Sequence, residues 1–161
     1  MTRKIAIQGV KGSFHHQVVS ECYDDTVSLV ECSTFDELSK AVLAGKCDQA
    51  VMAIENSIAG SILPNYALLD QHELVIVAEF YLSIQLNLMG LPGQSITDIK
   101  EVHSHPMALL QCKNFFHDHP QIKLVESHDT AEEAMKISQK HLKNRGAIAG
   151  IRAAEIYGLS I

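Results

Sequence analysis

The sequence predicts an α/β protein made of two lobes. Short apolar runs alternate with helical stretches over residues 4–69, and the same alternation begins again at residue 101. Between the two series lies an apolar stretch, 74–89, that is longer than an ordinary strand. Alternating strands and helices are typical of parallel sheets with right-handed crossovers. The interruption predicts that the chain passes from one lobe to another.

The first series has clear signals for its element boundaries. We expect strands at 4–8, 27–32 and 49–54, and helices at 14–22 and 63–69. A further helix is expected after Ser33 or Thr34, either of which can cap it, because Glu37 stands three residues after Thr34 as in a capping box. Gly45 is expected to end that helix.

The second series follows the turn Leu91-Pro92-Gly93. We expect strands at 101–105, 122–126 and 147–149, and helices at 106–116, 131–141 and 152–157. Pro106 would occupy the first helical position, where proline is tolerated, and Asp129 or Thr130 would cap the next helix. The stretch 74–89 is expected to form one long strand pair or a strand that crosses between the lobes.

The order of the elements predicts that the second lobe is inserted into the first. We place residues 1–76 and 150–161 in the first α/β lobe and residues 77–149 in the second. A hinged pair of lobes of this kind binds its ligand in the cleft between them.

The composition limits the classes of protein to which this chain can belong. The 161 residues are 47% hydrophobic and 20% charged, which is typical of a globular protein. The net charge of −6, without a cluster of Lys or Arg, argues against a nucleic acid or an anionic membrane surface as partner. The four cysteines form no CxxC pair, which favours free thiols in a reducing compartment. Because no apolar signal region is present, we expect a cytoplasmic protein.

Four loops share one design, in which a strand leads through a small or polar turn into a helix. Helix N-terminal amides carry a partial positive charge, and ligands of open α/β sheets bind at the carboxyl ends of strands. The loops are Gly9-Val10-Lys11-Gly12-Ser13, Glu55-Asn56-Ser57-Ile58-Ala59-Gly60-Ser61, Ser104-His105-Pro106 and His128-Asp129-Thr130-Ala131. Together they predict a site for a small anion.

Each candidate also has a plain structural interpretation. The first loop lacks the GxxxxGK[ST] pattern and is also explained as a tight turn. Asn56, Ser57 and Asp129 are equally suited to capping helices, and Gln111 to a solvated helix face. His103 and His105 alternate on a strand, but no spacing of His and Cys supports a metal site, so none is expected.

Taken together, the motifs resemble the prephenate dehydratase family along nearly the whole chain. The matching residues are Gly9-x-x-Gly12-Ser13-Phe14, Glu55-Asn56-Ser57-x-x-Gly60-Ser61, Ser104-His105-Pro106-x-Ala108-Leu109-x-Gln111-Cys112, Asp129-Thr130-Ala131 and Ala147-x-Ala149-x-x-x-Ala153-Ala154-x-x-Tyr157-Gly158-Leu159. The resemblance implies a two-lobed architecture similar to type II periplasmic binding proteins, with a cleft between the lobes and with the C-terminal part of the catalytic region missing.

The resemblance also implies an activity and a set of site residues. The family expels the ring hydroxyl and ring carboxylate of prephenate to give phenylpyruvate, a step of phenylalanine biosynthesis, and it needs no cofactor. The resemblance assigns Asn56, Ser57 and Gln111 to catalysis. It assigns a second group to substrate binding: Ser13, Glu55, Gly60, Ser104, His105, Asp129, Thr130 and Ala131.

Two family features are not found in this sequence. The family has a Thr-Arg-Phe motif, whose Thr is the leading candidate for the acid that assists hydroxide departure, and a regulatory ACT domain that binds phenylalanine. Neither occurs in the 161 residues, so we expect these residues alone to have little or no dehydratase activity. We also expect an open sheet edge, which invites a homodimer or strand exchange between copies.

Two other classes of protein remain open at this point. A non-catalytic module of the same fold that binds a small anion or another solute would bind an amino acid or a sugar but not prephenate. A structural or interaction protein would have no need for four polar turns at strand ends.

Overall fold

The computed structural model describes residues 2–23 and 26–161 and divides into two compact units. Unit 1 contains the chain up to Val10 together with Phe14–Ser83, and unit 2 contains Lys11–Ser13 and Ile84–Ile161. Each unit has its own sheet, so each is described by itself. Among the described residues, no helix has both the length and the apolar character needed to cross a bilayer.

Unit 1 is built on a parallel sheet of three strands in the order β2-β1-β3. Its strands are β1 (Lys4–Gln8), β2 (Ser28–Cys32) and β3 (Gln49–Val51). The central strand is buried on both faces because its alternate side chains pack on different helices. Ile5 and Ile7 pack with Val19 of α1 (Phe14–Cys22), whereas Ala6 packs with Leu38 of α2 (Phe35–Leu43).

The boundaries of α2 follow the local signals in the sequence. The Thr34 hydroxyl accepts a 3.1 Å hydrogen bond from the Glu37 amide, and the Glu37 carboxylate accepts a 2.8 Å bond from the Ser33 amide. The expected cap at Thr34 is therefore confirmed, although the reciprocal bond goes to Ser33. Gly45, with a positive φ of 64°, follows the helix as expected.

The chain after β3 departs from the expected strand 49–54. The strand ends at Val51, and a short antiparallel hairpin follows, made of β4 (Glu55–Asn56) and β5 (Gly60–Ser61). Helix α3 (Leu63–Gln71) comes next. The hairpin was not predicted, because a pair of two-residue strands has no alternating pattern of its own.

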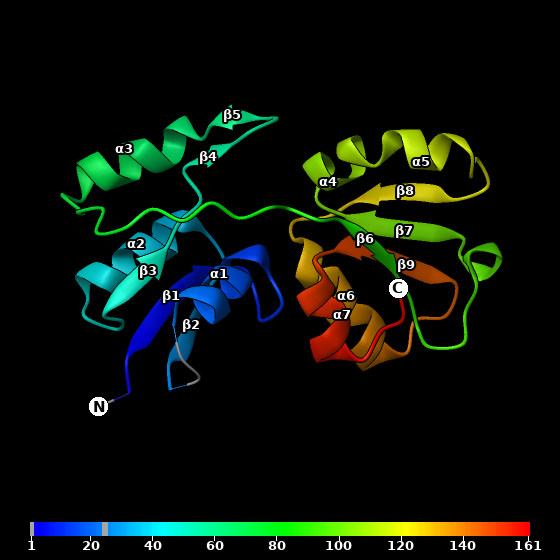
Figure 1. Ribbon diagram of the computed structural model, residues 1–161, viewed down its shortest axis with the longest axis horizontal. Helices are drawn as coiled ribbons and strands as arrows, with labels where there is room; N and C mark the ends of the chain where they lie inside the picture. The colour runs from blue at the N-terminus through cyan, green and yellow to red at the C-terminus, as the bar shows by residue number, and fades with distance from the viewer. Residues whose placement is uncertain (1, 24–25) are drawn as a thin grey trace. The chain divides into compact units, whose positions relative to one another are not determined.

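The segment between α3 and unit 2 differs from the prediction of a long strand. Residues 74–86 have no helix or strand, and regular pairing begins only at β6 (Asn87–Met89) (Figure 1). Several apolar side chains in this segment are exposed, including Val75, Val77 and Tyr81. Apolar content predicted a strand here, but a strand needs a partner, and no ladder among the described residues includes this segment.

Unit 2 is built on a mixed sheet of four strands in the order β6-β9-β7-β8. Its other strands are β7 (Glu101–Ser104), β8 (Lys123–Glu126) and β9 (Arg145–Ala149). Strands β7, β8 and β9 run parallel, and β6 is antiparallel to β9. The carboxyl ends of the three parallel strands therefore meet at one edge of the sheet.

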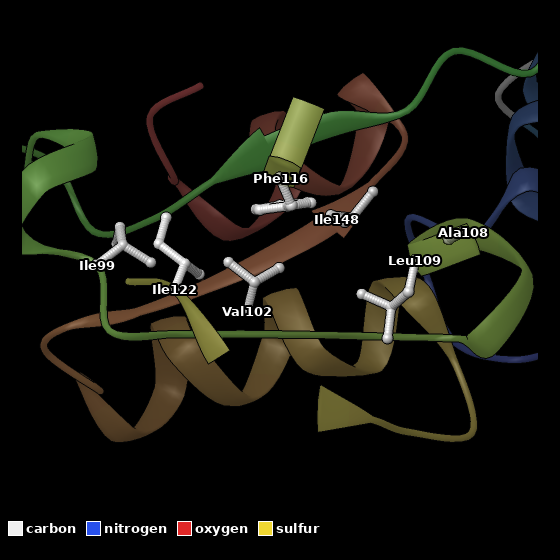
Figure 2. Packing of buried hydrophobic residues seen from close by; sticks show 7 residues of the cluster. All are labelled: Ile99, Val102, Ala108, Leu109, Phe116, Ile122 and Ile148. Atoms are coloured by element: carbon white, nitrogen blue, oxygen red, sulfur yellow. The ribbon is translucent and has the colours of Figure 1, made fainter. Parts of the chain in front are cut away.

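Helices cover both faces of this sheet (Figure 1). They are the 3-10 helix η1 (Ile96–Asp98), α4 (Pro106–Gln111), α5 (Lys113–His117), α6 (Thr130–Lys140) and α7 (Ile151–Tyr157). The single helix expected over 106–116 is split at Cys112, whose φ of −93° and ψ of 5° leave the helical region. The split turns Phe116 into the core with Val102 and Ile148 (Figure 2).

The last residues of the chain pack differently from the expected domain boundaries. Residues 150–161 were expected to rejoin the first lobe, but they belong to unit 2. Helix α7 packs on α6, and Ser160 forms an antiparallel bridge with Gly90 beside β6. The prediction was wrong because β9 and α7 simply continue the strand–helix alternation of unit 2. No local feature of the sequence shows on which unit these last residues pack.

Candidate functional site

The candidate residues of unit 1 lie on the β4–β5 hairpin. The Asn56 side-chain oxygen accepts hydrogen bonds from the amides of Ile58 (2.9 Å) and Ala59 (3.0 Å), which closes a turn. The Glu55 carboxylate accepts a 3.2 Å bond from Ser61. Among the residues that the structure describes, no protein group is bonded to the Asn56 amide nitrogen. Asn56 can therefore hold the turn and still donate to a ligand.

Ser57 and Gly60 complete the same turn. Ser57 is exposed, so its hydroxyl is accessible. Gly60 has a φ of 80°, a conformation that disfavours any residue with a Cβ. The hairpin thus brings Glu55, Asn56, Ser57 and Gly60 into one small turn, in place of the expected strand-to-helix corner.

Two side chains hold the chain just before this hairpin. The Ala53 amide donates a 3.3 Å hydrogen bond to His15 Nε2, and the Ala53 carbonyl accepts a 2.7 Å bond from Asn65 Nδ2. Burial lowers the pKa of His15 to about 4, so the ring is neutral at physiological pH. We did not predict either residue as functional. Asn65 lies in the first turn of α3 and carries no local sequence signal.

The first loop packs on the last helix within unit 2. A Cβ at Gly12, where φ is 90°, would lie 3.0 Å from Ala153 Cα, so only glycine fits without a shift. The Tyr157 hydroxyl donates a 2.6 Å hydrogen bond to the Lys11 carbonyl. Ser13 is buried in the same loop. The predicted Gly12-Ser13 motif therefore has a packing role whatever it binds.

Ser104 is fully buried at the end of β7. Its hydroxyl donates a 2.7 Å hydrogen bond to the Ile148 carbonyl on the neighbouring strand β9. Ala131 is also fully buried, so only its backbone could face a ligand. The structure thus gives both residues a structural position, and a role in substrate binding stays a prediction for them.

His105 and Asp129 lie close together where β7 and β8 end. His105 caps α4 by accepting a 3.2 Å hydrogen bond from the Met107 amide at Nδ1, and Asp129 caps α6 by accepting a 2.8 Å bond from the Glu132 amide. Burial raises the pKa of the Asp129 carboxyl, although its bond to the Glu132 amide and the nearby His105 act in the opposite direction. Thr130 follows as the first residue of α6.

Gln111 lies at the end of a helix and not at the end of a strand. It is the last residue of α4 and is half-buried. No hydrogen bond of its side chain occurs in the described part of the chain. Its assignment to catalysis therefore remains a prediction from the motif alone.

Comparison with known proteins gives the family of the chain. A model of the family described as prephenate dehydratase matches residues 5–161. The chain belongs to the prephenate dehydratase family. The Glu55-Asn56-Ser57, Ser104-His105-Pro106 and Asp129-Thr130 motifs of this prephenate dehydratase domain all lie within the matched range.

Two plant proteins are among its relatives. Arogenate dehydratase 2 of Petunia hybrida is 41% identical over 160 residues, which are 98% of this chain and 40% of the relative. Arogenate dehydratase/prephenate dehydratase 1 of Arabidopsis thaliana, which is chloroplastic, is 40% identical over 158 residues, again 98% of this chain and 40% of the relative. The prephenate dehydratase domain described here thus spans about 40% of the length of these relatives.

Solved structures of the family share the fold. The prephenate dehydratase of Arthrobacter aurescens in complex with L-Phe has a TM-score of 0.86 at 25% identity, covering 98% of this chain and 53% of that one. The enzyme of Staphylococcus aureus has a TM-score of 0.78 at 29% identity, covering 98% and 58%. A protein described as a novel type of quorum quenching acylase has a TM-score of 0.87 at 31% identity, covering 99% and 57%.

Proposed function

We propose that the chain carries substrate-binding and catalytic groups of a prephenate dehydratase. The match of the family model to residues 5–161 carries this proposal. The reaction takes prephenate to phenylpyruvate. The electron pair of the bond to the ring carboxylate moves into the ring as CO2 leaves, and the ring hydroxyl leaves as water after it accepts a proton. The product is aromatic, so the reaction needs only that the substrate be bound and oriented and that a proton reach the leaving hydroxyl.

The polar turns suit a substrate with two carboxylates. The Asn56 amide and the Ser57 hydroxyl can donate hydrogen bonds to a carboxylate from the hairpin of unit 1. In unit 2, Asp129 already accepts a bond from the Glu132 amide of the 11-residue helix α6, which leaves the Thr130 amide and hydroxyl to donate to a carboxylate beside His105. We propose each group as a carboxylate-binding element of its own unit.

Asp129 needs a separate argument, because a carboxylate repels an anionic substrate. Burial already raises its pKa, and a bound anion would raise the pKa further. A raised pKa favours the neutral carboxyl, which repels a bound anion less than a carboxylate does.

The acylase function of one structural relative is the second candidate. Its support is the TM-score of 0.87. An acylase that uses a cysteine nucleophile needs a thiolate, but burial raises the pKa of Cys32, Cys47 and Cys112, which favours the thiol. The curated relatives are dehydratases, so we favour the dehydratase.

Binding and turnover can be tested separately. Calorimetry of the 161-residue chain with prephenate, with arogenate and with an N-acyl amide tests which class of ligand it binds. For turnover, residues 5–161 would replace the matching segment of the Staphylococcus aureus enzyme, and phenylpyruvate would be measured by its absorbance in alkali. We expect prephenate binding and phenylpyruvate formation, both lost in the double variant Asn56→Ala, Gln111→Ala. A folded chimera without turnover, together with no prephenate binding by the chain, would refute the proposal.

The substrate could also be arogenate, the compound in the names of the plant relatives. Arogenate has an ammonium group where prephenate has a keto group. Tighter binding of arogenate than of prephenate would change the substrate assignment but leave the reaction class as proposed.

We further propose a cytoplasmic location and self-association. The four cysteines are free, which suits a reducing compartment such as the cytoplasm, although several relatives are chloroplastic. Exposed Val75, Val77 and Tyr81 on an unpaired segment support pairing between copies of the chain. Sedimentation over a range of concentrations would test this, and a monomer throughout would refute self-association.

A further inference from the structure

The chain between β3 and the Asn56 hairpin is held by side chains instead of by a strand partner. Residues 52–54 lie outside the sheet ladder. Both backbone groups of Ala53 are nonetheless bonded, the amide to His15 Nε2 at 3.3 Å and the carbonyl to Asn65 Nδ2 at 2.7 Å. Ala53 is half-buried, and a backbone group that leaves water without finding a partner is costly, so these two side chains fix the path of the chain at this point.

The His15 ring also reaches the neighbouring strand. It comes from α1, packs edge-on to Phe35 with ring centroids 5.5 Å apart, and hydrogen-bonds the backbone of Gln8, the last residue of β1. Because Nε2 accepts the Ala53 amide, the ring donates to Gln8 from Nδ1. A neutral ring with the proton on Nδ1 is the only form that makes both bonds. His15 therefore ties the ends of β1 and β3 together.

Asn65 fixes the other end of the hairpin. Its side chain is buried, at 2% exposure, in the first turn of α3, directly after β5. The Ile62 amide also donates a 2.9 Å hydrogen bond to the Ile54 carbonyl. Residues 54–62 thus form a loop that is closed at its base, and its tip carries Asn56 and Ser57.

We propose that His15 and Asn65 are a positioning pair that sets the Asn56–Ser57 turn through the Ala53 backbone. The pair does not touch the substrate. Its effect on binding rests on the proposed function, in which this turn contacts a carboxylate of prephenate. Neutral His15 keeps the turn in its binding position, and a protonated ring, which cannot accept the Ala53 amide, releases it.

The environment of the ring supports this behaviour. Burial lowers its pKa from 6.5 to about 4, and the bond to the Gln8 backbone acts in the opposite direction. In the described part of the chain, no carboxylate or ammonium group contributes to this shift, and the groups that face the ring are Gln8, Phe35 and Ala53.

The first test is nuclear magnetic resonance of the intact chain over pH 3.5–8, with ¹⁵N-labelled histidine and backbone. We expect Nδ1 of His15 to carry the proton, the ring to titrate near pH 4, and the amides of Ala53, Ile58 and Ala59 to shift with the same midpoint. Titration of His15 near its ordinary value of 6.5, or hairpin amides that do not follow the ring, would overturn the proposal.

The second test compares variants for prephenate binding. His15→Ala removes both bonds and should weaken prephenate binding by about tenfold, whereas His15→Gln, which can both donate and accept, should stay within about threefold. Asn65→Asp should resemble His15→Ala because it loses the donor. His117→Ala is the control, since that side chain is 88% exposed and belongs to unit 2.

The outcomes separate the two proposals. A folded His15→Ala chain with unchanged hairpin amides and unchanged binding overturns the positioning role alone. If the unmodified chain binds no prephenate and the folded chimera forms no phenylpyruvate, the proposed function fails. The amide shifts of the variants then decide the positioning role by themselves: movement of Ile58 and Ala59 supports it, and no movement overturns it.

Discussion

Tyr157 donates a 2.6 Å hydrogen bond from its hydroxyl to the carbonyl oxygen of Lys11, which lies 146 residues earlier in the chain. The bond joins two parts of unit 2, because the three residues Lys11–Ser13 belong to unit 2 while their neighbours belong to unit 1. It fixes the Gly12-Ser13 loop on α7. Gly12 and Tyr157, which come from two separate family motifs, therefore both help to pack this loop on α7.

Replacing Tyr157 by Phe should destabilise unit 2. The change removes the bond to Lys11 but keeps the ring, so we expect the free energy of unfolding to fall by about 1 kcal/mol. Urea denaturation followed by circular dichroism measures this. Tyr81→Phe is the matched control, because Tyr81 is 92% exposed and should give no change. Equal effects of the two variants would contradict the role of the bond.

Replacing Gly12 by Ala should cost more than the loss of that one bond. A Cβ would meet Ala153 Cα at 3.0 Å and would impose strain at a φ of 90°. We expect a loss of about 1–3 kcal/mol in the free energy of unfolding, since backbone has to move. Gly45→Ala has a positive φ of 64° but open space around it, so it measures the strain alone. A loss at Gly12 no larger than at Gly45 would show that the close approach to α7 is unimportant.

Stability should depend on pH through His15. The ring has a folded pKa of about 4, below its ordinary value of 6.5, so between these pH values the unfolded chain binds more protons. The free energy of unfolding should therefore rise with pH in this window, by up to about 1.4 kcal/mol per unit, and His15 should contribute no further change above about pH 7.5. Denaturation of the wild type and of His15→Gln at several pH values gives the difference. A difference that does not vary between pH 4.5 and 7 would contradict the neutral, buried ring.

Local signals predicted the elements that they directly encode. The strand Lys4–Gln8 and the helix Phe14–Cys22 have the predicted bounds, and Thr34 caps α2 as its spacing from Glu37 indicates. These features depend on side chains a few residues apart. The family motifs were recognisable for the same reason.

Features that depend on distant partners were not predictable. The segment 74–86 is as apolar as a strand, but among the described residues no strand pairs with it. The sequence of residues 150–161 does not indicate that they pack on unit 2. The positions of His15 and Asn65 around Ala53 depend on three elements folding together. Alone, each of these residues is an ordinary helical side chain.

Asp129 should act in the free protein mainly as a helix cap whose charge is unfavourable. Asp129→Ala removes the 2.8 Å bond to the Glu132 amide and should cost about 1 kcal/mol. Asp129→Asn keeps an accepting oxygen. The pKa of the Asp129 carboxyl is raised in the folded chain. The free energy of unfolding should therefore fall as pH rises from the unfolded pKa of this carboxyl to its folded pKa. Asparagine does not titrate, so the Asn variant should not show this fall.

Thermal or urea unfolding at pH 7 distinguishes the Asp129 variants. We expect the Asn variant to be at least as stable as the wild type and the Ala variant to be less stable. An Asn variant as unstable as the Ala variant would show that the charge itself stabilises the helix.

Ser104 gives the sharpest separation between a structural and a substrate-binding role. Its hydroxyl is buried and bonded to the Ile148 carbonyl at 2.7 Å, so Ser104→Ala leaves that carbonyl without this donor. We expect the free energy of unfolding to fall by about 1–2 kcal/mol, with prephenate affinity unchanged in the folded fraction. Ser127→Ala is the control, because among the described residues that hydroxyl makes a single long bond, of 3.5 Å, to the Asp129 carbonyl. A Ser104→Ala chain of normal stability that binds prephenate at least tenfold more weakly would place the hydroxyl in the site after all.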